Sequence, residues 1–81
     1  MELKETANLM VSSDYKERFK AEYYQLKIRL EKLRYMLQKW DNHELEFTPS
    51  CPRSIYDVQI KSMIDYLAIL EARAIIESIE L

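Results

Sequence analysis

The amino-acid sequence predicts an all-α protein: an antiparallel two-helix hairpin, preceded by a short helix or a frayed arm, that assembles into a homo-oligomeric helical bundle. Between positions 19 and 40, apolar side chains recur at alternating steps of four and three residues, the heptad pattern of packed helices. A second stretch is apolar on most of its sides. The 81 residues include no Gly, which excludes a P-loop, a dinucleotide fingerprint and Gly-rich hairpin turns.

The first helix is expected over about residues 15–40. Its heptad seam consists of Phe19, Tyr23, Leu26, Leu30, Leu33, Leu37 and Trp40. Asp14 precedes Glu17 by three residues, a spacing typical of a capping box at the start of a helix. We therefore divide the chain into an N-terminal arm or short helix, residues 1–13, and a hairpin domain, residues 14–81.

The second helix is expected over about residues 54–79, after a loop at 41–53. Pro52 opposes an earlier start, and Ser54 with Asp57 three residues later has the spacing of a helix cap. In the loop, Leu45 and Phe47 are expected to fold back over the end of the hairpin. Cys51, between two Pro residues, is expected to be a free thiol that packs inside the loop.

Two helices without a staple are expected to need further copies of the chain. The single Cys and single His exclude a disulfide framework and a zinc site within one chain, and small scaffolds without such staples depend on partners. We expect a homo-oligomer of two to six copies. Its predicted interface lies opposite the seam of the first helix and on the far side of the second, at Tyr24, Ile28, Tyr35, Ile69 and Ile76.

Several classes of function are disfavoured by composition. No apolar run approaches the roughly 18 residues that span a bilayer, and no signal-peptide pattern is present, so we expect a cytoplasmic protein without membrane contact. The calculated isoelectric point of 5.4 disfavours binding of duplex nucleic acid. Two helices without a deep pocket make an enzyme improbable, and no cofactor or metal site is expected.

Charge is segregated along the chain. Residues 15–40 carry eight basic side chains and three acidic ones, whereas residues 54–81 carry two basic and five acidic ones. One interpretation is attraction between helices together with ordinary solvated faces. The other is an anion site on the first helix, in which Lys and Arg hold phosphates and neighbouring Tyr rings stack on bases.

The second half resembles a known family. Gln59, Met63, Tyr66, Ile69, Leu70 and Arg73 form a spaced motif, preceded by Tyr15, Arg18, Glu22, Leu26, Leu30 and Leu33. From Tyr15 onward this pattern is similar to small helical-hairpin proteins of phages and prophages, described as related to a crAss-like phage protein. The motif consists of helix-packing residues, so it indicates a fold more than an activity.

A looser resemblance concerns function. Phe47, Pro49 and Cys51, followed by Leu70-x2-Arg73, are similar to the hairpin domain of phage anti-defence sponges. Those proteins form hexamers that sequester nucleotide second messengers, including cyclic oligonucleotides and cyclic ADP-ribose isomers. The resemblance implies a phage-type protein of the bacterial cytoplasm that binds such a messenger at subunit interfaces without catalysis.

Six residues are the candidate ligand contacts under this hypothesis: Tyr15, Lys16, Arg18, Lys20, Tyr66 and Arg73. The first four lie where the N-terminus of the first helix offers free N–H groups and partial positive charge to an anion. Two alternatives stay open, namely Tyr66 in the core and Arg73 paired with an acid of the first helix. The competing function is a self-associating helical adaptor without a small ligand, which would use the stripe of Tyr24, Ile28 and Tyr35.

Overall fold

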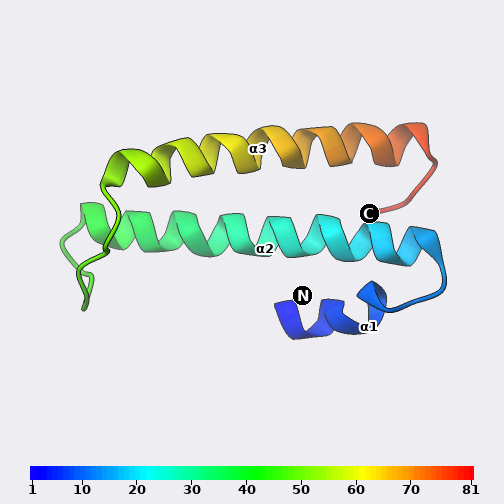
Figure 1. Ribbon diagram of the computed structural model, residues 1–81, viewed down its shortest axis with the longest axis horizontal. Helices are drawn as coiled ribbons and strands as arrows, with labels where there is room; N and C mark the ends of the chain where they lie inside the picture. Colours follow the sequence, from blue (N-terminus) through cyan, green and yellow to red (C-terminus); the bar gives the residue numbers. More distant parts are fainter.

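The computed structural model describes residues 1–81 and consists of helices joined by irregular segments, without strands. Two long helices, α2 (Tyr15–Asp41) and α3 (Arg53–Ile76), run antiparallel and side by side (Figure 1). A 3-10 turn, η1 (Leu3–Thr6), and one turn of helix, α1 (Ala7–Met10), lie on the other side of α2. The predicted hairpin and the short N-terminal helix are therefore both present.

The start of α2 is capped by Asp14, as predicted, but not by a complete capping box. The Asp14 side chain accepts a hydrogen bond of 2.9 Å from the backbone N–H of Lys16. The reciprocal bond expected from Glu17 does not form, because the N–H of Asp14 donates instead to Ser12 Oγ at 3.0 Å. Ser12 thus satisfies the donor for which the sequence suggested Glu17.

The predicted heptad seam of α2 faces α3. All seven of its side chains are buried or half-buried. The side chains of α3 that meet them also follow steps of four and three residues: Tyr56, Ile60, Met63, Leu67, Leu70 and Ala74. Packing is tightest at the open end of the hairpin, where Phe19 and Tyr23 contact Leu70 and Ala74 in one buried cluster.

The bounds of α3 differ from the prediction at both ends. The helix begins at Arg53, directly after Pro52, and no side chain caps it, so the expected Ser54 cap is wrong. It ends at Ile76, because Ser78 adopts a positive φ of 58° and reverses the chain. The N–H of Ile79 then donates to the carbonyl of Ala74 at 2.8 Å, and the Ile79 side chain is buried in the core cluster.

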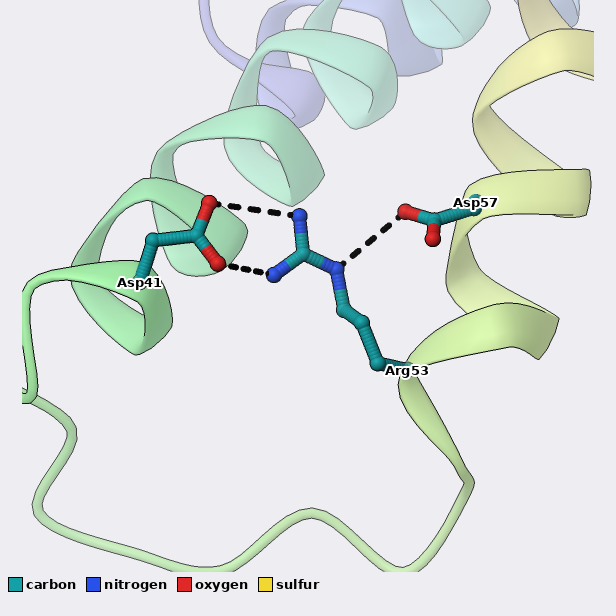
Figure 2. Close-up of polar contacts among 3 residues, drawn as sticks. All are labelled: Asp41, Arg53 and Asp57. Atoms are coloured by element: carbon teal, nitrogen blue, oxygen red, sulfur yellow. Dashed lines mark hydrogen bonds and ion pairs between the residues drawn. The ribbon is translucent and has the colours of Figure 1, made fainter.

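The connection between the long helices is held by Arg53. Its guanidinium lies between the carboxylates of Asp41, at the end of α2, and Asp57, one turn into α3 (Figure 2). The same group sits 5.7 Å from the centre of the Trp40 ring. We call this group, Asp41, Arg53 and Asp57, the Arg53 fork. It links the end of α2 to the start of α3.

Two expectations about the loop are wrong. Phe47 is 57% exposed, and of the expected pair only Leu45 is half-buried. Cys51 is exposed rather than packed inside the loop. The connection passes the end of α2 on the side away from α3 (Figure 1), where residues 44–47 border an open hollow beside Tyr35, Met36 and Lys39 instead of covering the end of the hairpin.

The N-terminal segment is anchored to α2 by a buried polar contact. Thr6 is fully buried; its hydroxyl donates to the carbonyl of Leu3 at 2.6 Å and accepts from Nε2 of Gln25 at 2.9 Å. On this side of α2, Ile28 is only 9% exposed, whereas Tyr35 remains exposed. The chain's own N-terminus therefore packs on part of the α2 side that was predicted to meet a second subunit.

The molecule is elongated and exposes more surface than a compact monomer. Its radius of gyration is 15.0 Å, against about 12 Å for a globular chain of this length. Its accessible surface is 5945 Å², against about 5,200 Å² for a typical monomer of this mass. Only 10 of 81 residues are buried, so a single copy has a small core. None of its helices combines the length and apolar character needed to cross a membrane.

Candidate anion-binding site

Three of the candidate ligand contacts meet at the open end of the hairpin. Tyr15, the first residue of α2, donates its hydroxyl proton to Oε1 of Glu77 at 2.7 Å. Arg73, near the end of α3, donates through Nη2 to the Tyr15 hydroxyl at 2.9 Å and through Nε to Oε2 of Glu77 at 3.2 Å. Lys16 joins from the same turn, with Nζ donating to the carbonyl of Ser78 at 3.3 Å. We call these four residues the Tyr15–Arg73 cluster: Tyr15, Lys16, Arg73 and Glu77.

An aromatic ring of the core lies beneath the cluster. The Arg73 guanidinium lies 5.0 Å from the centre of the Phe19 ring, and that ring is buried in the core. Tyr15 lies one turn before Phe19, with ring centres 6.4 Å apart. A cation over a buried ring is held by the ring quadrupole as well as by its hydrogen bonds. The core therefore fixes the position of the Arg73 charge.

The hydrogen bonds set the protonation states of the cluster. The hydroxyl of Tyr15 and the guanidinium of Arg73 hold the pKa of Glu77 below its ordinary value of 4.5. The same bond to Glu77 raises the pKa of Tyr15 above 10.0. At neutral pH the cluster thus contains an ionised carboxylate, a protonated phenol and a guanidinium.

Three bases near this end, Lys16 of the cluster together with Arg18 and Lys20, have no carboxylate partner. Lys16 donates to the backbone carbonyl already described, and Nη1 of Arg18 donates to the carbonyl of Ser12 at 2.8 Å. Lys20 is half-buried and forms no ion pair. Because backbone carbonyls satisfy donors without cancelling charge, these side chains keep their positive charge for an anion.

Three other predictions concerned the free N-terminus of α2, the place of Tyr66 and the partner of Arg73. The N–H of Lys16 is bound to Asp14, so this part of the α2 N-terminus is not free as expected. Tyr66 lies two turns before Arg73 and donates to the Glu22 carboxylate; at 42% exposure it is neither in the core nor in the cluster. Arg73 pairs with Glu77 of the segment that follows its own helix, not with an acid of the first helix.

Sequence reasoning missed two members of this site, Glu77 and Phe19 as the ring beneath Arg73. The signal for Glu77 was present, because it lies four residues after Arg73, the spacing at which helical side chains pair. The contact with Tyr15 had no local signal. It depends on the register of the two helices, which places Tyr15 of α2 beside Arg73 of α3, 58 positions away in the sequence.

The main hollows of the molecule lie away from the cluster. The largest hollow, of about 570 Å³, lies between residues 1–4 and the stretch of α2 from Ile28 to Tyr35. A second hollow, of about 320 Å³, lies beside the Arg53 fork. Neither contains a predicted ligand contact. The charged donors and the aromatic ring of the cluster therefore do not line either of these hollows.

The comparison with protein families decides where this hairpin belongs. The Sequestin family model matches residues 13–76. The chain belongs to the Sequestin family. The matched stretch runs from just before the Asp14 cap to the last residue of α3, so it includes Tyr15, Lys16 and Arg73 but not Glu77. No curated protein and no solved structure matches the chain. The resemblance to crAss-like phage proteins stays a prediction.

Proposed function

We propose that this Sequestin protein sequesters a nucleotide second messenger, a cyclic oligonucleotide or a cyclic ADP-ribose isomer, and thereby acts as a phage anti-defence protein. The family membership carries this proposal, because the family name denotes sequestration and the match spans the whole hairpin. In this function the protein binds its ligand stoichiometrically and catalyses no reaction.

The Tyr15–Arg73 cluster supplies chemistry that suits such a ligand. Phosphates bind through charge-assisted hydrogen bonds from Lys and Arg, and three bases here carry no ion-paired carboxylate. The Tyr15 ring is 47% exposed and offers a face on which a base stacks. Because the cluster is open on one side, a second copy supplies the opposite wall, which accords with binding at a subunit interface.

Calorimetric titration tests this function. The purified protein is titrated with cyclic di- and trinucleotides and cyclic ADP-ribose isomers, and its mass is measured with and without ligand. We expect one ligand to bind with a defined stoichiometry and a Kd near 1 nM, about −12 kcal/mol, as competition with a host receptor requires. A panel in which no compound binds contradicts the proposal.

Charge reversal tests the site. Arg18→Glu and Lys16→Glu are expected to abolish binding of the ligand found in the panel without dissociating the oligomer, because each replaces a phosphate donor by a repelling carboxylate. Lys32→Glu is the matched control: it makes the same charge change on α2, far from the cluster and beside the largest hollow. Unchanged affinity in the first two variants rejects the site, and loss of binding in Lys32→Glu alone moves the site to that hollow.

A second candidate function is a helical adaptor that contacts another protein and has no small ligand. The exposed apolar side chains on the outer side of α3 favour it, because patches of this kind mark protein interfaces. The titration separates the two candidates, since an adaptor leaves every compound of the panel unbound.

A further inference from the structure

The outer side of α3 has no partner within the chain. Among the helical elements α3 contacts only α2, and no element lies over its other side (Figure 1). Five apolar side chains of α3 are more than half exposed: Ile55, Val58, Ile69, Ile75 and Ile76. Water contact with so many branched apolar groups is unfavourable, and burying each is worth about 1.5–3 kcal/mol.

A second heptad pattern runs along this side. It comprises Ser54, Val58, Lys61, Asp65, Ala68 and Ala72, at steps of four and three residues, and all six are exposed. This outer stripe lies opposite the residues of α3 that pack on α2. Its two central members, Lys61 and Asp65, are exposed and form no ion pair within the chain.

The order of residues in the outer stripe is self-complementary. Positions at equal distances before and after residue 63 form three pairs: Ser54 with Ala72, Val58 with Ala68, and Lys61 with Asp65. Two antiparallel helices related by a twofold axis bring such pairs face to face, each pair occurring twice. The axis falls at residue 63, close to the middle of α3, so the two helices overlap over nearly their full length, about 30 Å.

We propose that α3 packs against α3 of a second copy as an antiparallel pair with a twofold axis near Met63. Lys61 then meets Asp65 of the partner subunit, and Val58 packs on Ala68 of the partner subunit. Ile69 lies beside the partner's Ile55 and covers the edge of the charge pair. The small side chains at 68 and 72 allow the two helices to approach closely.

Charge decides against the other arrangements of this surface. In a parallel pair Lys61 would face a second Lys61, and Asp65 a second Asp65, and such like-charge contacts are destabilising. The outer stripe carries one charge of each sign, so it also offers no excess acidic charge to the basic α2 of another copy. The antiparallel α3 pair satisfies both central charges at once.

Reciprocal charge reversal tests the pair by sedimentation without ligand. The wild-type chain is expected to sediment at twice 9.8 kDa or a larger even multiple. Lys61→Asp and Asp65→Lys each place like charges face to face, so each is expected to weaken the α3 contact about tenfold or more. A one-to-one mixture of the two variants restores opposite charges across the axis and is expected to regain the pair, as is the double variant K61D/D65K.

Circular dichroism shows that each variant retains its helices, and Glu44→Lys, a charge reversal in the exposed loop, is the matched control. A wild-type monomer near 9.8 kDa overturns the proposal, as do single variants of unchanged mass or a mixture that stays dissociated. The inference does not rest on the proposed function. Assembly that follows the charge swaps upholds the pair even if no messenger binds, and messenger binding by an assembly that ignores the swaps upholds the function alone.

Discussion

His43 and Ser78 adopt positive φ angles of 59° and 58°, in a chain that contains no Gly. Each lies just after the end of a long helix. The N–H of the following residue then donates to a helix carbonyl: Glu44 donates to Lys39, and Ile79 donates to Ala74. This is the Schellman ending, for which Gly is the usual residue because a Cβ is unfavourable in the left-handed conformation. Both helices therefore end at the expense of local strain.

Replacement of Ser78 by Gly is expected to relieve that strain. The left-handed conformation costs a residue with a Cβ about 1–2 kcal/mol, and part of the gain is lost to the greater freedom of Gly in the unfolded chain. We expect Ser78→Gly to raise the free energy of unfolding by about 0.5–1 kcal/mol in urea titrations at fixed protein concentration. Ser78→Ala, which keeps a Cβ, is the control and gives no increase; a loss of stability in Ser78→Gly contradicts the assignment.

Glu77 makes stability depend on acid. The hydrogen bond from Tyr15 and the guanidinium of Arg73 lower the pKa of Glu77 in the folded state below 4.5. The carboxylate therefore stabilises the fold above pH 4.5, and this contribution is lost as the pH falls through the lowered pKa. We expect the difference in Tm between the wild type and Glu77→Gln to be largest near neutral pH and to vanish in acid. Glu80→Gln, whose carboxylate accepts no hydrogen bond, is the control; a Tm gap that does not narrow as the pH falls below 4.5 contradicts the prediction.

At the scale of the helices, the α2–α3 contact is strongest at the open end. Leu70 is fully buried among Phe19, Tyr23 and Ala74, whereas the side chains nearer the loop are mostly half-buried. The core and the Tyr15–Arg73 cluster thus share one end of the hairpin. The loop end is held by the exposed Arg53 fork, and exposed ion pairs contribute little to stability.

Leu70→Ala is expected to cost about 2–5 kcal/mol of unfolding free energy, because it leaves a cavity in that cluster. Ile75→Ala removes a branched apolar side chain from the same helix at a position that is 81% exposed, and its expected cost is within about 0.5 kcal/mol. Chemical denaturation of both variants measures the difference. Equal losses would show that the core does not lie where the structure places it.

The helices show which features the sequence could predict. Steps of four and three residues located the face of α2 that packs on α3, because apolar burial is repeated at every turn and no single residue decides it. The second helix, apolar on most of its sides, gave no such face. The end of α3 was harder, since a helix normally stops at Gly and here stops at Ser78. The exposure of Phe47 had no signal in the sequence, because it depends on the path that the loop takes past the end of α2.

At the scale of the whole molecule, α2 is the central element. It packs against α3 on one side and η1 and α1 on the other, and so has less free apolar surface than the sequence suggested. Ile28 is an example, since its place opposite the seam predicted a contact with another subunit but the N-terminal segment packs there. Such a contact between residues far apart in the chain cannot be predicted from periodicity alone, nor can the meeting of Tyr15 with Arg73.

The lone thiol of the chain is placed where it is experimentally useful. Cys51 is exposed on the connection at one end of the long axis, and the Tyr15–Arg73 cluster lies at the opposite end (Figure 1). The native protein therefore accepts a single maleimide dye or nitroxide without any redesign of its cysteines. Spectroscopic distances between such labels on neighbouring copies would report how the hairpins are arranged. The labels would leave the outer stripe of α3 and the Tyr15–Arg73 cluster unmodified.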